Sequence, residues 1–222
     1  MEMHTLRQTS VLLPGLDEED LDEVASLDGD RLTEFSYTGA QLRELSLSGT
    51  TLMSGRITEL ATQRAYLDKV TWNSVELSGC DLSNLRVSDS KLSRVVFRNC
   101  RLLGALLEEV TLDNVMFERC RLDYAVFARV RAAGPVIFSS CSLREASFAR
   151  ADMSGTAVDG CDLLRTEFDG GVYRGCDLRG NDLAGIRGVS VLRQVTIERS
   201  QLLGLAQAVA ADLEVAVADN AT

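Results

Sequence analysis

The sequence has few of the residues, and none of the common motifs, on which enzymes and metal proteins rely. Its 222 residues include a single histidine, His4, and only two prolines, and no CxxC, HExxH, GxSxG or P-loop motif is present. Such motifs supply the metal ligands, nucleophiles and phosphate-binding loops that catalysis requires. Acidic pairs such as Glu108 and Glu109 are expected on any solvated surface. The sequence therefore predicts a protein that is not an enzyme, with no catalytic residue, no metal site and no cofactor.

The sequence also lacks the features of a membrane or secreted protein. No apolar run approaches the ~18 residues of a membrane-spanning helix, and residues 1–13 carry one apolar cluster with no small-residue cleavage site after it. The net charge is −10, and no basic patch dominates as nucleic-acid binding would require. These absences predict a cytoplasmic protein that neither enters a membrane nor binds nucleic acid directly.

An apolar residue recurs at every fifth position over most of the chain. One series runs from Leu27 to Phe127 with a weak step at Thr62, and a second series, shifted by one residue, runs from Phe138 to Leu183. A helix would need a period of 3.6 and a half-exposed strand a period of 2, so neither template fits. A period of five predicts short straight segments joined by regularly spaced corners.

Residue types also return after about 20 positions, a distance of four five-residue units. Five cysteines follow this spacing, and each lies two residues before a leucine. A fixed period of this length indicates one structural unit stacked on copies of itself. Inward-facing thiols behave as small apolar groups, so we expect these cysteines to be reduced and structural. The predicted interior ladder consists of Cys80, Cys100, Cys120, Cys141, Cys161, Phe97, Phe117, Phe127, Phe148 and Phe168.

Several of the five-residue units resemble the motif of the pentapeptide-repeat family, which is a small residue, Asp or Asn, Leu, and two polar residues. The clearest are residues 80–84, 151–155, 161–165 and 176–180, and the resemblance extends over roughly residues 25–187. It implies an all-β fold, a right-handed quadrilateral β-helix of about eight coils. Four quintets would form one coil of this fold.

The pattern divides the chain into three segments. Residues 1–26 are interpreted as an N-terminal acidic cap, in which Asp17 begins a short helix and the end of the first coil is covered; the alternative is an acidic docking segment. Residues 27–187 form the β-helix, with the phase slip near 128–138 interpreted as a one-residue bulge. Residues 188–222 form the last coil and a C-terminal helix.

The resemblance also implies a partner. The Qnr- and MfpA-type members of the family are acidic rods that resemble duplex DNA and engage DNA gyrase or topoisomerase IV. By this resemblance the protein would be a DNA mimic that confers resistance to topoisomerase poisons, and the alternative is a scaffold or adaptor with an unrelated partner. Residues 1–60 hold 12 acidic and four basic residues, whereas residues 61–187 are nearly balanced. A continuous negative stripe on the rod would favour the DNA mimic, and alternating charges would favour the adaptor.

Two sets of residues are candidates for binding partners. Apolar residues of the C-terminal helix recur at helical spacing, and the resemblance implies that this region pairs two chains into a homodimer. Four aspartates near this helix would then form a negative region across the junction, although they may equally bond only to their own backbone as part of the repeat motif. The predicted dimer residues are Leu202, Leu205, Ala206, Val209 and Leu213, and the predicted partner-binding residues are Asp152, Asp162, Asp177 and Asp182.

Overall fold

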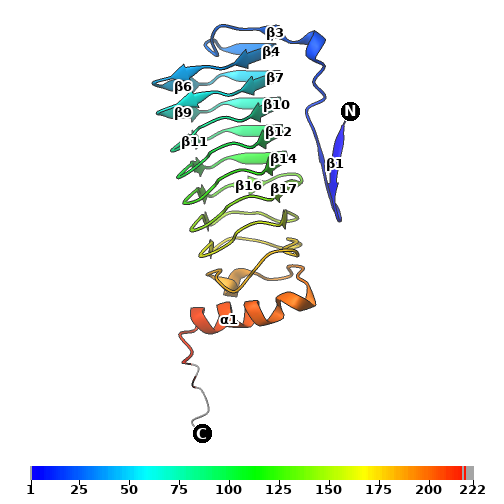
Figure 1. Cartoon of the computed structure of the whole chain (residues 1–222), viewed down its shortest axis with the longest axis vertical. Coiled ribbons are helices and arrows are strands. Elements are labelled where there is room, and N and C mark those ends of the chain that lie inside the picture. The colour runs from blue at the N-terminus through cyan, green and yellow to red at the C-terminus, as the bar shows by residue number, and fades with distance from the viewer. Residues whose placement is uncertain (1, 217, 219–222) are drawn as a thin grey trace.

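The computed structural model describes residues 2–216 and 218, and most of them form one long solenoid of parallel strands (Figure 1). This confirms the expected all-β solenoid. The solenoid has about seven turns rather than eight. Strands end with residue Asp169, and the following residues continue the winding through turns and isolated bridges such as Asp177 with Thr196. Within the described residues, no helix is long and apolar enough to cross a bilayer.

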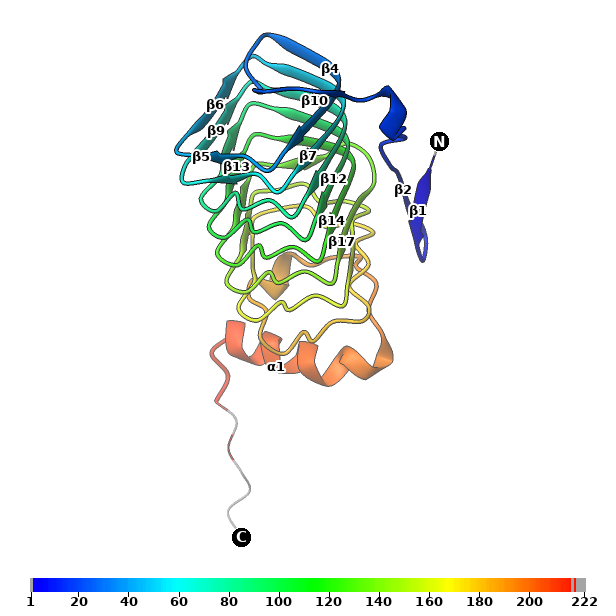
Figure 2. The ribbon, with the colours of Figure 1, turned by 45° about the horizontal axis from the view of Figure 1, so that its top comes forward.

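Two parallel sheets form the sides of the solenoid (Figure 2), and successive strands are offset by 20 residues, as in the pairs of Trp72 with Leu92 and Leu92 with Leu112. The first sheet contains β3 (Asp22–Glu23), β4 (Arg31–Thr38), β7 (Thr51–Thr58), β10 (Thr71–Ser78), β12 (Lys91–Arg98), β14 (Thr111–Glu118), β16 (Arg131–Ala132), β17 (Val136–Ser139) and β19 (Ala157–Asp159). The second contains β6 (Leu45–Ser48), β9 (Ala65–Asp68), β11 (Arg86–Ser88), β13 (Leu106–Glu108), β15 (Val126–Ala128), β18 (Ser147–Ala149) and β20 (Glu167–Asp169). A short pair, β5 (Gln41–Leu42) and β8 (Ala61–Thr62), lies on another side.

Corners recur every five residues because one residue of most quintets has a positive φ. In one turn these residues are Asn84, Asp89, Arg94 and Asn99, with φ values of 59°, 47°, 51° and 51°. Left-handed backbone bends the chain at each corner, and it is uncommon outside glycine, asparagine and aspartate. Four corners in 20 residues agree with the quadrilateral cross-section that the five-residue period predicts.

The interior is filled by ladders of identical side chains. Phe97 stacks on Phe117 with ring centroids 4.9 Å apart, and Phe127 stacks on Phe148 at 4.7 Å. The described cysteines are all free and buried, including Cys176. Each residue of the predicted interior ladder, Cys80, Cys100, Cys120, Cys141, Cys161, Phe97, Phe117, Phe127, Phe148 and Phe168, lies inside the solenoid.

Buried thiols in the ladder donate hydrogen bonds to the backbone of the preceding turn. The Cys120 Sγ donates to the carbonyl oxygen of Phe97 at 3.3 Å, and the Cys141 Sγ donates to that of Phe117 at 3.3 Å. Burial raises the pKa of the Cys176 thiol to about 12. A thiol in this state is protonated at neutral pH and is therefore a poor nucleophile.

The phase slip is a single inserted residue. Leu112 pairs with Ala132, an offset of 20, whereas Val115 pairs with Val136, an offset of 21. Gly134 lies in the bulge, and a Cβ at this position would meet the Asp113 Oδ1 at 2.0 Å. A side chain at this point would therefore force the Asp113 carboxylate to move.

The C-terminal end of the solenoid is covered by α1 (Leu202–Asp212), which follows the 3₁₀ turns η2 (Val189–Val191) and η3 (Arg199–Gln201) (Figure 1). Buried Gln201 donates to the carbonyl oxygens of Leu178 at 2.8 Å and Asn181 at 2.7 Å. At the other end of α1, Asp212 accepts a hydrogen bond from the Val189 backbone at 2.6 Å. These contacts hold the helix across the last turn.

The N-terminal segment is more than an end cap. Its first part is an antiparallel hairpin of β1 (Met3–Leu6) and β2 (Thr9–Leu12) that runs along the side of the solenoid (Figures 1 and 2). Only the following residues cover the first turn, through the 3₁₀ turn η1 (Glu18–Asp20) and the pairing of β3 with β4. Asp17 caps η1 by accepting from the Glu19 N–H at 3.4 Å, so the expected helix is a single 3₁₀ turn.

Candidate protein-binding surfaces

The outward side chains of the solenoid form regular columns. Within each quintet the central residue and the residue two before it point inward, so the remaining positions face solvent. Because the register between turns is 20 residues, equivalent outward positions lie above one another at a spacing of about 4.8 Å. A surface site on this fold is therefore a column of residues from successive turns.

One column on the second sheet has the composition of a protein interface. It consists of Tyr66, Arg86, Leu106 and Val126, which are neighbours in the strand register. Tyr66 is 40% exposed, Arg86 is exposed and the other two are half-buried. Tyr124, at the corner two residues before Val126, is 60% exposed. Tyrosine and arginine are the residues most enriched at the centres of protein interfaces.

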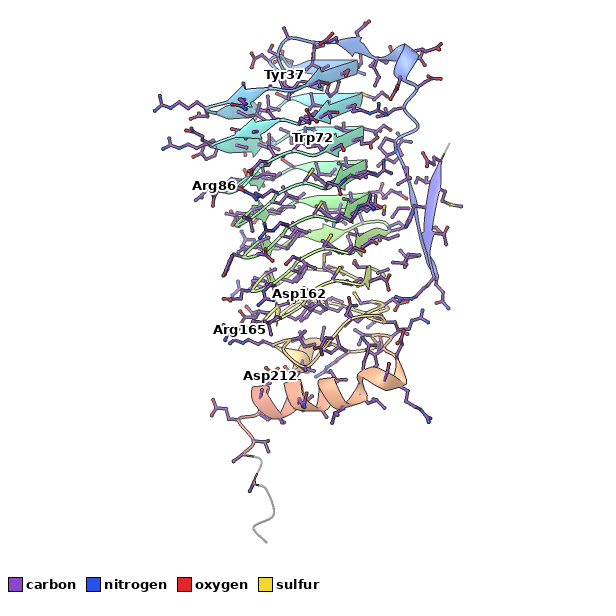
Figure 3. The ribbon with its side chains drawn as sticks, viewed as in Figure 1. Tyr37, Trp72, Arg86, Asp162, Arg165 and Asp212 are labelled. Carbon is purple, nitrogen blue, oxygen red and sulfur yellow. The ribbon has the colours of Figure 1, made fainter. Side chains whose placement is uncertain are left out.

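We refer to Tyr66, Arg86, Leu106 and Val126 as the side-face column. Figure 3 shows Arg86 pointing outward on the edge of the solenoid away from the N-terminal hairpin. The sequence analysis did not identify this column. The signal was present, because the residue before each central apolar residue reads Tyr, Arg, Leu and Val at steps of 20.

A ladder of alternating charge crosses the first sheet. Arg56 lies between Glu18 and Glu76, with N–O distances of 2.6 and 3.8 Å. Arg98 lies between Glu76 and Glu118, at 2.6 and 3.0 Å. Although partial burial opposes the shift, these two carboxylates raise the pKa of Arg98 above its usual value. Along this face the negative charges are neutralised in turn, so they do not form a continuous negative stripe.

The four aspartates predicted to bind a partner lie on three sides of the solenoid. Two of them form ion pairs: Asp162 with Arg144, at an N–O distance of 2.8 Å, and Asp177 with Arg179, at 2.5 Å. Although partial burial opposes it, the Leu164 N–H and Arg144 lower the pKa of Asp162. All four accept a hydrogen bond from the backbone N–H two residues later: Asp152 from Ser154 at 3.1 Å, Asp162 from Leu164 at 3.1 Å, Asp177 from Arg179 at 3.1 Å and Asp182 from Ala184 at 2.9 Å. These bonds to their own backbone are the local role that the sequence analysis gave as the alternative. Binding of a partner by these residues stays a prediction.

The predicted dimer residues on α1 divide between two faces. Leu205 packs against the solenoid core together with buried Ala208. The opposite face exposes large apolar side chains, of which Leu203 is 72% exposed and had not been predicted. The other predicted residues point outward: Leu202 is 55% exposed, Val209 37%, Leu213 68%, and Ala206 is also exposed. The helix therefore covers its own solenoid and still presents an apolar surface.

The N-terminal end of the rod is the most acidic part of the described surface. Residues 17–34 carry nine exposed acidic side chains and one arginine, Arg31. One of these acids, Glu18, is paired with Arg56. The nine are Asp17, Glu18, Glu19, Asp20, Asp22, Glu23, Asp28, Asp30 and Glu34.

The described residues offer little for catalysis. Among residues 2–216 and 218, no group of three His, Cys, Asp or Glu side chains is placed to hold a metal ion. One open groove, of about 710 Å³, lies over β5 and β8. Its lining includes Gln41, Arg43, Gln63 and Asp81, and it is open to solvent, unlike the enclosed and mostly apolar pockets that bind small molecules.

Comparisons with known proteins agree with this fold. A family model described as pentapeptide repeats matches residues 63–99, 90–129 and 136–164, with eight copies. A comparison with curated proteins finds no match. Among solved structures, the chain is similar to HetL, a pentapeptide repeat protein involved in heterocyst differentiation regulation from the cyanobacterium Nostoc sp. strain PCC 7120. The identity is 17%, 75% of this chain and 82% of that chain are covered, and the TM-score is 0.49.

Two further structures show weaker likeness. A trypsin-treated form of QnrB1, a plasmid-mediated fluoroquinolone resistance protein, is 16% identical, with 81% of this chain and 100% of that chain covered and a TM-score of 0.46. Rfr23, a pentapeptide repeat protein from the cyanobacterium Cyanothece 51142, is 14% identical, with 55% and 91% covered and a TM-score of 0.21. Because the TM-scores are below 0.5, these likenesses say nothing about the partner of this chain.

Proposed function

The chain belongs to the pentapeptide-repeat family, and we propose that it is a non-enzymatic rod that binds other proteins through its side faces. The side-face column carries this proposal, because it presents a tyrosine, an arginine and two aliphatic residues in one line on a rigid sheet. Aromatic side chains and arginine contribute most of the binding energy in many interfaces. A rigid surface also loses little conformational entropy when it binds.

The charges of the solenoid support an adaptor better than a DNA mimic. Arg56 and Arg98 each lie between two glutamates of the charge ladder, so positive and negative groups alternate along the first sheet. A phosphate backbone carries charge of one sign at short intervals. This face of the solenoid therefore does not reproduce the field of duplex DNA.

The proposal is tested by changing the side-face column alone. Tyr66→Ala combined with Arg86→Glu should leave the melting temperature unchanged, because both side chains point away from the core. Proteins cross-linked to the wild type in a lysate of the native cells are identified by mass spectrometry and compared with those of the variant. Arg193→Glu, a charge reversal at another exposed arginine, is the control. We expect a protein that is retained by the wild type and the control and lost by the double variant. Identical sets of captured proteins would contradict the proposal.

DNA gyrase or topoisomerase IV is a second candidate partner, and the acidic N-terminal end favours it. The exposed carboxylates of residues 17–34 form a surface of one sign that a basic, DNA-binding surface would attract. The test is DNA supercoiling by gyrase with and without a quinolone. The protein should alter supercoiling or protect the enzyme, and Glu19→Lys with Glu23→Lys should weaken the effect. A protein without any effect at micromolar concentration leaves the adaptor function.

We further propose that two copies associate through the exposed face of α1. Three large apolar side chains of this helix and its C-cap, Leu202, Leu203 and Leu213, are 55%, 72% and 68% exposed, and groups of exposed apolar residues mark interaction sites. Leu203→Glu should convert a dimer to a monomer in light scattering, whereas Gln207→Glu, at an exposed polar position of the same helix, should not. A monomeric wild type would contradict the dimer. We also place the protein in the cytoplasm, a reducing compartment that suits its free, buried thiols.

A further inference from the structure

The N-terminal hairpin covers an apolar stripe on the outside of the first sheet. In the turns on either side of the hairpin the outward residue at this position is polar, as Arg56, Glu76 and Asp177 show. Only in the four turns beneath the hairpin is it apolar. We refer to these residues as the apolar stripe, which consists of Val96, Met116, Ile137 and Ala157, each at most 1% exposed.

The stripe is separate from the interior of the solenoid. Together with the hairpin residues Val11 and Leu13 it forms a second hydrophobic cluster, against which Leu6 also packs. Val11 is fully buried and Leu13 is 5% exposed. The interior ladders are complete without these side chains, because the stripe points away from them. The stripe therefore serves the contact with the hairpin rather than the stability of the coil itself.

The hairpin is attached to the solenoid by side chains. The Leu12 N–H donates to the Asn114 Oδ1 at 2.8 Å, and the Thr9 hydroxyl donates to the Gly155 carbonyl oxygen at 3.4 Å. Among the described residues, no backbone–backbone hydrogen bond joins residues 2–13 to the solenoid. A two-stranded hairpin is only marginally stable by itself. It can therefore leave the surface without breaking any hydrogen bond of the parallel sheets.

The tip of the hairpin adds a charged contact at the far end of the stripe. The Arg7 guanidinium bonds to Asp159, lies 3.4 Å from the Asp177 Oδ1 and donates to the Arg179 carbonyl oxygen at 3.1 Å. The surface thus offers carboxylates for a cation at one end and apolar contacts along its length. An extended peptide with an arginine or lysine and apolar side chains at alternate positions would match it.

We propose that the apolar stripe, with Asp159 and Asp177 at its end, is a docking surface for an extended segment of a partner protein. This segment carries apolar side chains at alternate positions and an arginine or lysine. Residues 2–13 occupy the surface as a tethered competitor, and the partner binds by displacing them. The inference deepens the proposed protein-binding function and rests on it.

Release of the hairpin is measured by thiol labelling. Met116→Cys places one thiol beneath the hairpin, and the native cysteines are buried and give little background. Adding Arg7→Glu should raise the rate of maleimide labelling about tenfold or more, the equivalent of one hydrogen bond to a charged group. Arg193→Glu, a charge reversal at an exposed site, should leave the rate unchanged. Ile137→Cys repeats the measurement if Met116→Cys fails to fold. Equal labelling rates with and without Arg7→Glu would overturn the inference.

Docking is measured with a fluorescent peptide of residues 2–13 added to the full chain. We expect saturable binding to the Arg7→Glu, Val11→Asp variant and none to the wild type, whose surface is occupied. Adding Asp159→Lys should abolish the binding, because the peptide arginine then meets a like charge. Absence of peptide binding to the Arg7→Glu, Val11→Asp variant would overturn the inference. A higher oligomer of this variant in light scattering would also overturn it, because the stripe would then bind a second copy of the chain. The capture of partners by the side-face column, on another side of the rod, tests the proposed function separately (Figure 3).

Discussion

Removal of the Phe127 ring is the sharpest test of how the solenoid is held together. The side chain is fully buried and stacks on Phe148 with centroids 4.7 Å apart. It also meets Phe117 and Phe138 edge-on, at 6.3 and 5.8 Å. The turns above and below are fixed by the strand register, so the space left by the ring cannot easily collapse.

The expected cost of Phe127→Ala follows from these contacts. Truncation of a buried phenylalanine costs roughly 3–5 kcal/mol of unfolding free energy. Because aromatic pairs contribute about 0.5–1.5 kcal/mol beyond their buried area, we expect the upper part of this range. Since small domains are stable by only about 5–15 kcal/mol, the variant should fold but with little reserve.

Urea denaturation followed by circular dichroism measures this cost. The midpoint should fall with little change in slope, because the slope reports the surface exposed on unfolding. Ala128→Ser and Arg129→Ala are the controls, since these neighbours are half-buried and exposed. They should have little effect. Similar losses at all three positions would refute the assignment of Phe127 to the interior and the five-residue register with it.

Three further predictions concern single positions. Cys120→Asp should aggregate because it buries an unpaired charge, whereas Cys120→Ala should still fold, and both are judged by size-exclusion chromatography. Gly55→Ala should lower the melting temperature, since its Cβ would lie 2.0 Å from the Phe35 ring; an unchanged value would contradict this close approach. Arg179 lowers the pKa of Asp177, so the Asp177 carboxylate stabilises the fold at pH values above the ordinary carboxyl pKa of 3.8. This stabilisation is lost as the pH falls through the lower pKa of the folded state. In melting curves below about pH 4, Asp177→Asn should therefore lose less stability than the wild type.

The interior of the solenoid could be predicted from the sequence because each quintet meets the same requirement. The central residue of every unit is enclosed by the turns on either side, so it must be apolar wherever the coil continues. Phe97, Phe117 and Phe138 satisfy this rule at steps of 20 and 21, and they stack as expected. The bulge near Gly134 was predictable for the same reason, since the step between central residues changes there from 20 to 21.

The hairpin could not be predicted from the N-terminal residues themselves. Residues 3–12 show no regular alternation of apolar and polar side chains, so their pattern does not distinguish a strand from a loop. The information lies in its binding surface, where outward positions of distant quintets become apolar in four successive turns. Such a column is visible only when the register between turns is known. It could have been found by comparing the residue before each central position at steps of 20, with one step of 21 at the phase slip, which reads Val96, Met116, Ile137 and Ala157.

The orientation of α1 was also beyond the sequence pattern. The helix is apolar on more than one side, so its spacing allows several faces to be buried. Its orientation depends on the last turn, where Gln201 bonds to the carbonyl groups of Leu178 and Asn181. Gly204 also approaches Ala184 closely, and a Cβ on this glycine would lie 3.1 Å from the Ala184 nitrogen. These contacts turn Leu205 inward and Leu203 outward.

Charge shows most clearly why composition alone does not determine a partner. The net charge of −10 favours a DNA mimic when it is treated as a property of the whole rod. The register between turns then places Arg98 beside Glu76 and Glu118, and Arg129 beside Glu108 and Glu109, so the middle of the rod cancels its own charge. Eight exposed acids of residues 17–34 have no such ion pair within the described part of the chain and lie together at the N-terminal end. A partner selected by charge must therefore bind this end, whereas a partner selected by shape and apolar contact must bind the side faces.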